Sequence, residues 1–250
     1  MHPTKAPAAR AILLALAGAL ALAGALAGCE SSQEKAAALR KLFHGEKIDR
    51  QGLQISRTSR YVKVLESALL HDENGVAAVL VLRSDAPGTL RGVPIAITLR
   101  GPGGRILFQN NAPGLEPALT SLSVLEPHHA SIWIDDQIPA GDYPGTLQAR
   151  VGEAPAVSGP VPRIAIAGAH TVEDPANGPG VQGTLANPSA PAQQALVLFA
   201  LARRGGRPVA AGRAILTNLA PHASAPFQAF FIGRPAGARL QLEAPASTLP

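Results

Sequence analysis

From residue 61 onward, short apolar stretches are separated by turn residues. One stretch alternates strictly between apolar and smaller or polar residues, and its apolar positions are Val93, Ile95, Ile97 and Leu99. A period of two is typical of a strand with one buried face. Because this region has no convincing helical period, the pattern predicts an all-β fold.

A β-hairpin is predicted where two apolar stretches, residues 65–70 and 76–82, flank a polar segment. The segment ends in Asn74-Gly75, a dipeptide that adopts the positive backbone angles of a tight reversal. Similar turn signals recur about every ten residues, and this spacing is typical of an immunoglobulin-like sandwich.

One short helix is expected ahead of the strands. Ser31 and Glu34 have the spacing of a capping box. Leu39, Leu42 and Phe43 follow at intervals of three and four, which gives the segment one apolar face. Residues 29–60 are therefore predicted to form a helical stalk or linker.

The apolar pattern is repeated within the chain. A shift of 102 residues aligns two stretches without a gap, and further along the shift falls to 94. The difference of eight residues lies in the loop 110–118, where an insertion is tolerated. The repeat predicts two tandem immunoglobulin-like β-sandwich domains, residues 61–151 and 163–250. The aligned pairs include Val79 with Val181, Ile97 with Phe199, Leu99 with Leu201, His128 with His222, and Trp133 with Phe227.

The large side chains of these domains are expected in their cores. Trp133 and Phe227 occupy equivalent positions in the repeat. The chain has one cysteine, so no disulfide within the chain can form. Hydrophobic packing must therefore supply the stability of both predicted domains.

The first 28 residues have the composition of an export signal. Lys5 and Arg10 precede an apolar run of 17 residues, 11–27. The run ends in Leu26-Ala27-Gly28-Cys29, which resembles the lipobox of bacterial lipoproteins. This resemblance implies a diacylglyceryl group on Cys29, removal of residues 1–28, and a location on the extracytoplasmic face of the cell membrane. An uncleaved signal anchor is the alternative, since 17 residues are close to the shortest span of a bilayer.

The second domain resembles the FxLYD-type domain of bacterial surface proteins and lipoproteins. Phe199 and Leu201 match the first and third positions of the motif, whereas Ala202 and Arg203 stand where tyrosine and aspartate are expected. The resemblance implies a small immunoglobulin-like sandwich and no catalytic residue. The segments that carry it are Val181–Asn187, Leu198–Leu201, Gly205-Gly206 and Leu219-Ala220-Pro221-His222.

Charge is distributed unevenly along the chain. Residues 61–155 carry six basic and ten acidic groups, a net charge of −4, whereas residues 156–250 carry seven and three, a net charge of +4. There is no run of Lys and Arg and no basic face rich in aromatic residues, so a nucleic-acid partner is not expected. Residues 30–60 have a net charge of +3 and either attract anionic head groups or form a solvated helix face.

Few residues have the pattern of a chemical site. The sequence lacks a nucleophile elbow, a phosphate loop, a zinc-protease motif and a dinucleotide fingerprint. His128-His129 and Asp135-Asp136 are metal-ligand types, but adjacent strand residues point to opposite faces. The sequence therefore predicts no catalytic residue, no bound metal and no cofactor.

An apolar interaction face is the remaining candidate. The segment 195–202 is apolar at every position, so both faces of this strand should be covered. We expect Leu198, Ala200 and one of Phe230 and Phe231 to pack either on the first domain or on a partner.

Together, these features predict a non-enzymatic, lipid-anchored cell-envelope protein. It would act as an interaction or structural module through its two sandwiches, with an envelope protein as partner. The alternative is an extracytoplasmic solute- or metal-binding lipoprotein that serves a transporter.

Overall fold

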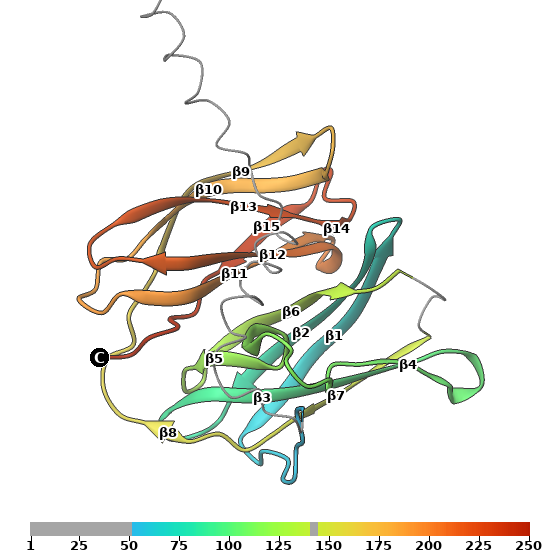
Figure 1. Ribbon diagram of the computed structural model, residues 1–250, viewed down its shortest axis with the longest axis horizontal. Coiled ribbons are helices and arrows are strands. Elements are labelled where there is room, and N and C mark those ends of the chain that lie inside the picture. Colours follow the sequence, from blue (N-terminus) through green and yellow to red (C-terminus); the bar gives the residue numbers. More distant parts are fainter. Residues whose placement is uncertain (1–51, 141–144) are drawn as a thin grey trace, which may run out of the picture. The chain divides into compact units, whose positions relative to one another are not determined.

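A computed structural model describes residues 52–140 and 145–250, which fold almost entirely as antiparallel β-strands (Figure 1). The all-β prediction is confirmed. Residues Ser32–Pro250 belong to one compact unit, so the boundaries of two separate domains stay a prediction. The expected signal peptide and helix lie outside the described residues.

The first half of the described chain, residues 58–157, contains two sheets. One has the order β1-β2-β6, and the other is built on β3, which pairs with β4, β5, β7 and β8. The strands are β1 (Val62–Asp72), β2 (Gly75–Ser84), β3 (Thr89–Arg100), β4 (Ile106–Gln109), β5 (Ser121–Leu125), β6 (Ala130–Ile138), β7 (Thr146–Val151) and β8 (Ala156–Val157), with short 3-10 turns η1 (Pro102–Gly104) and η2 (Pro117–Leu119).

The second half, residues 165–243, also contains two sheets. One has the order β9-β10-β13, and the other has the order β14-β12-β11-β15. The strands are β9 (Ala165–Asp174), β10 (Gly178–Ala186), β11 (Gln193–Arg204), β12 (Arg207–Leu219), β13 (Ser224–Phe230), β14 (Ile232–Gly233) and β15 (Arg239–Glu243).

Both halves use the same strand order. The sheet β1-β2-β6 corresponds to β9-β10-β13, and β4-β3-β7 corresponds to β12-β11-β15. If β5, β8 and β14 are set aside and the remaining paired strands of each half are lettered A, B, C, C′, E and F, then A, B and E form one sheet and C′, C and F form the other, as in an immunoglobulin-like sandwich. His128 and His222 have φ angles of 57° and 55°, so the histidine of the repeated Pro-His pair adopts the left-handed backbone conformation in both halves.

The local predictions for the first half are confirmed. β1 and β2 form the expected hairpin, with Asp72 opposite Gly75. The alternating apolar residues of β3 are all buried, and Pro94, Ala96, Thr98 and Arg100 between them are partly exposed. Trp133 and Phe227 are also buried, as expected for core residues.

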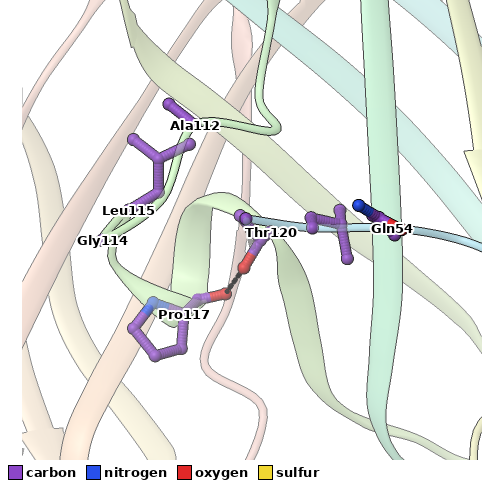
Figure 2. A pocket seen from close by; sticks show the side chains of 8 residues that line it. Gln54, Ala112, Gly114, Leu115, Pro117 and Thr120 are labelled. Atoms are coloured by element: carbon purple, nitrogen blue, oxygen red, sulfur yellow. Dashed lines mark hydrogen bonds between the residues drawn. The ribbon is translucent and has the colours of Figure 1, made fainter. Parts of the chain in front are cut away.

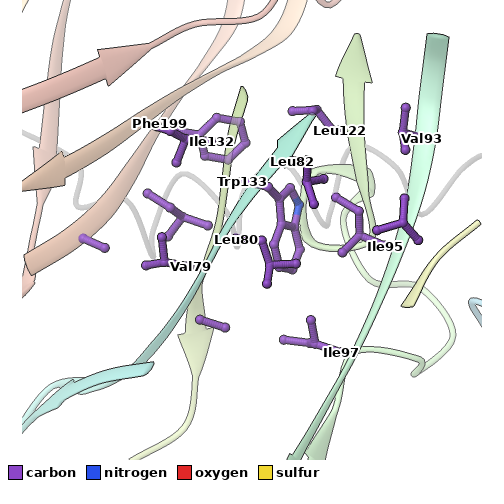
Figure 3. Close-up of a cluster of buried hydrophobic side chains, with 14 of the residues drawn as sticks. Val79, Leu80, Leu82, Val93, Ile95, Ile97, Leu122, Ile132, Trp133 and Phe199 are labelled. Carbon is purple, nitrogen blue, oxygen red and sulfur yellow. The ribbon is translucent and has the colours of Figure 1, made fainter. Parts of the chain in front are cut away.

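The two halves share a hydrophobic core. Trp133 lies among aliphatic residues of β2 and β3, and Phe199 of the second half belongs to the same cluster (Figure 3). Leu201, Ala211 and Ile232 of the second half also join it. The sheets β1-β2-β6 and β14-β12-β11-β15 therefore pack against each other, and both faces of β2 and of β11 are covered.

The residues that were expected to form an interaction face are covered within the chain. Leu198, Ala200 and Phe231 belong to the second half's own core, and Phe230 is half-buried. The contact with the first half is made by the alternate β11 residues Phe199 and Leu201. Side chains alternate between the two faces of a strand, and the sequence pattern did not indicate which set faces which core.

Candidate functional site

A buried ion pair lies in the seam, which is the contact between the sheets β1-β2-β6 and β14-β12-β11-β15. β12 places Arg213 there, and its side chain is 2% exposed. The Nε atom of Arg213 donates to Oδ1 of Asp136 at 2.8 Å, and its backbone N–H donates to Oδ2 at 2.9 Å. A buried charge is costly unless it is paired, so this pair fixes β12 against β6.

Two more carboxyl groups surround this pair. Asp135 is 1% exposed and accepts a hydrogen bond from the backbone N–H of Gln137 at 3.0 Å. Burial raises the pKa of Asp135 to about 6, against the opposing effect of Arg213. Glu116 is also buried, and its charge acts on Arg213. One guanidinium group therefore faces three carboxyl groups, and one of these titrates just below neutral pH.

Two more polar contacts between the halves also have the donor in the second half and the acceptor in the first. Arg203 of β11 donates from two nitrogens to the carboxylate of Glu66 on β1, at 3.0 and 2.7 Å. The backbone N–H of Gly233 donates to Asp72 at 2.7 Å. In both ion pairs of the seam the acid belongs to the first half and the arginine to the second, in line with the opposite net charges of the two segments. This charge difference was the available sequence signal for the seam, although it did not identify Arg213 or Arg203.

Arg203 stands at a position where the FxLYD-type motif has aspartate. Its Nε atom also donates to Gln241 of β15 at 3.1 Å, and one terminal nitrogen donates to the carbonyl of Gly206 at 2.8 Å. An aspartate at this position would face Glu66 with a like charge.

A pocket of about 320 Å³ lies where the seam meets the segment that connects the halves. Its polar lining includes the Glu126–Arg163 ion pair, His129, Ser131 and Glu243. Glu243 accepts a hydrogen bond from the backbone N–H of Ile132 at 2.9 Å. Burial raises its pKa, although hydrogen bonds from Ser131 and Ile132 oppose this effect. Apolar side chains form the remaining walls of this seam pocket, so it suits a small ligand with polar and apolar parts.

A second pocket, of about 580 Å³, lies beside the loop 112–120 (Figure 2). No charged side chain lines it, and the Thr120 hydroxyl donates to the carbonyl of Pro117 at 3.2 Å. This loop overlaps the segment expected to be a tolerated insertion. It is nevertheless held from inside, because Trp133 donates to the carbonyl of Ala118 at 3.0 Å.

Asn110 fixes the other end of this loop. Its side-chain nitrogen donates to the carbonyls of Ile95 and Leu119 at 2.9 and 2.7 Å, and its side-chain oxygen accepts from the backbone N–H of Ile97 at 2.7 Å. Asn110 is fully buried. Sequence reasoning missed this residue, since a polar residue in a loop gives no sign of burial.

The structure separates the candidate metal ligands. Asp135 and Asp136 lie in the seam, whereas His128 lies in a turn where its backbone N–H donates to the carbonyl of Ser84 at 2.7 Å. Among residues 52–140 and 145–250, no group of three or more His, Cys, Asp or Glu side chains is placed to hold a metal ion. The lipobox residues Leu26, Ala27, Gly28 and Cys29 lie outside the described residues.

In the part of the chain that the structure describes, no helix is both long and apolar enough to cross a membrane. No protein-family model matches the chain, and no curated protein shows significant sequence similarity to it.

Proposed function

We propose that this chain is a lipid-anchored protein of the bacterial cell envelope without enzymatic activity. A diacylglyceryl group on Cys29 would hold it at the extracytoplasmic face of the cell membrane. The observation that carries this proposal is the only cysteine of the sequence, which follows a basic segment, an apolar run and Leu26-Ala27-Gly28. Two acyl chains are enough for stable attachment, whereas one holds only marginally.

The body of the protein would act as an interaction or structural module, with an envelope protein as partner. One observation supports this role. The two halves share a core and several charged contacts. A force on one half, or the binding of a partner to it, would therefore be transmitted to the other half. The resemblance of the second half to FxLYD-type domains supports a location outside the cytoplasm.

Mass spectrometry of the protein from a bacterial host tests the anchor. We expect an N-terminal fragment that begins at Cys29 and carries the mass of a diacylglyceryl group. The matched variant Cys29→Ser should keep its leader or be released without lipid. An unmodified thiol at position 29 in membrane-bound protein would contradict the proposal.

The seam pocket favours a second candidate, a solute- or metal-binding lipoprotein that serves a transporter. A ligand at 100 times its Kd raises the free energy of unfolding by about 2.7 kcal/mol. A panel of metabolites and divalent metals should then contain a compound that raises the melting temperature. Ala130 lines the pocket and is exposed, so Ala130→Trp should abolish that rise by filling the space. A panel without any shift, or a shift that survives this substitution, would contradict binding in this pocket.

A further inference from the structure

The outer edge of β15 has no neighbouring strand among the described residues. β15 pairs with β11 on its inner side. With β14 set aside, β15 has the place of strand F beside strand C (β11), and an immunoglobulin-like sandwich has a strand G on the outer side of F. Here the chain turns instead toward Gln193 of β11, whose side-chain oxygen accepts from the backbone N–H groups of Ser247 and Thr248 at 2.8 and 3.0 Å. The position of strand G therefore stays open.

Four other edge strands carry features that discourage pairing with a further strand, whereas β7, like β15, pairs in regular register. The ladders of β1, β6 and β9 contain register shifts, and β13 contains Pro226. Bulges and prolines are common protections of sheet edges. β15 has neither, and its five residues pair with β11 in regular register from Arg239 to Glu243.

The sequence of β15 is complementary to itself. It reads Arg239-Leu240-Gln241-Leu242-Glu243. If two copies pair antiparallel about Gln241, Arg239 lies opposite Glu243 of the second copy at both ends, and Leu240 lies opposite Leu242. Opposite charges and apolar residues in cross-strand pairs both stabilise a sheet. A two-fold axis repeats each pair, so the same five residues serve both copies.

Arg239 has no counter-charge among the residues of its own copy that the structure describes. Its register partner on β11 is Arg203, which is already bound to Glu66. Arg239 is exposed, and no ion-pair partner for it is found among the described residues.

The seam pocket of a second copy has acceptor groups for the guanidinium group of Arg239. Its lining includes Gln241, Leu242 and Glu243, together with Glu126. Glu243 already accepts one backbone hydrogen bond, and a carboxylate has acceptor sites for more.

We propose that a second copy of this chain docks on β15, so that the two four-stranded sheets join into one sheet of eight strands. The Arg239 side chain of each copy then enters the seam pocket of the other and pairs with Glu243. Main-chain hydrogen bonds between the two β15 strands supply affinity, and the charged pairs set the register. This dimer does not depend on the lipid anchor.

Sedimentation equilibrium tests the charged pairs. The chain from residue 30 onward retains the whole compact unit Ser32–Pro250 and lacks Cys29. Its dimer should have a Kd between about 1 µM and 1 mM, which is the range of a weak interface. Arg239→Glu places like charges opposite each other twice and should weaken dimerisation by about tenfold or more. The double variant R239E/E243R should restore it. The control Arg91→Glu makes the same charge change at an exposed position of β3 and should leave it unchanged.

Disulfide cross-linking tests the geometry independently. In the same chain, Gln241→Cys places two thiols opposite each other at the two-fold axis, so oxidation should give a covalent dimer. The control Ser67→Cys lies at an exposed position of the edge strand β1 and should stay monomeric.

A chain that is monomeric throughout this range, a dimer that resists R239E, or a Q241C variant that cross-links no faster than S67C would overturn the proposal. If E243R lowers the melting temperature and so disturbs folding, the R239E variant and the Q241C cross-link still test the proposal. The state of Cys29 is read separately by mass spectrometry, so failure of the anchor and failure of the dimer are distinguishable.

Discussion

The two halves share a strand order but differ in what fills their cores. The first half surrounds Trp133 with large aliphatic side chains and takes in Phe199 and Leu201 from the second half. In the second half's own core, five of the twelve buried residues are alanines. These alanines are Ala200, Ala202, Ala210, Ala214 and Ala229. One strand order therefore accommodates two differently filled cores, and residues of the second half complete the core of the first.

The largest expected effect comes from breaking the buried ion pair that joins the halves. Arg213→Met leaves Asp136 and two nearby carboxyl groups without their counter-charge, so it should lower the free energy of unfolding by about 3–5 kcal/mol. Urea unfolding followed by the fluorescence of Trp133, the only tryptophan, measures this loss. The exposed control Arg91→Met should change it by less than about 0.5 kcal/mol. A loss below about 1 kcal/mol would show that the pair does not hold the seam.

A smaller effect should separate the two cores. Leu201→Ala and Leu198→Ala remove the same atoms from opposite faces of β11, and each should cost about 2–4 kcal/mol. Hydrogen exchange should rise mainly in β2 and β6 for Leu201→Ala, and mainly in β10 and β13 for Leu198→Ala, because the two side chains belong to different clusters. The same exchange pattern in both variants would contradict this division.

The seam should also respond to pH through Asp135. Its pKa in the folded protein, about 6, lies above the ordinary value of 3.8, so the folded state holds this proton more tightly than the unfolded state. The resulting stability is present below about pH 4 and is lost as the pH rises through 6. Asp135→Asn should therefore raise the free energy of unfolding at pH 7 by about 1–3 kcal/mol.

The difference between Asp135→Asn and the parent chain should shrink as the pH falls from 7 to 4. Urea unfolding at several pH values measures it. A variant that is less stable than the parent at pH 7 would mean that the ionised carboxylate is needed beside Arg213.

The smallest expected effect concerns the partly exposed pairs. Arg203→Gln loses a bidentate contact whose side chains are 20% and 32% exposed, and it should cost about 1 kcal/mol. Lys63→Gln loses a contact to Asp85 within the first half, where the lysine is 64% exposed, and it should cost less than about 0.5 kcal/mol. Equal losses in thermal unfolding would contradict a special role for the pair between the halves.

Much of the fold could be predicted from the sequence because the pattern that indicates a strand or a hairpin involves residues that are close together in the sequence. The alternation in β3 and the β1-β2 hairpin depend on neighbouring residues only, and both were predicted at their observed positions, although the turn is formed by Glu73-Asn74 rather than by Asn74-Gly75. The repeat also aligned Trp133 with Phe227, which lie on corresponding strands.

The seam could not be predicted residue by residue. Covered faces were expected for the apolar stretch of β11, but the choice between Leu198 and Leu201 as the contact depends on how two sheets meet. The pairing of Arg213 with Asp136 likewise joins residues 77 positions apart. In the sequence, only the opposite net charges of the two segments indicated this pairing, and a net charge does not identify the residues that pair.

The shared core has a consequence for the exposed connection between the halves. Residues 158–160 are exposed, with Gly159 at a φ of 117°, so a protease has access to this peptide. Since Phe199 and Arg213 bind the first half without help from the connecting backbone, cleavage there should yield two fragments that still migrate as a single species. Expressed apart and then mixed, such fragments should reassemble.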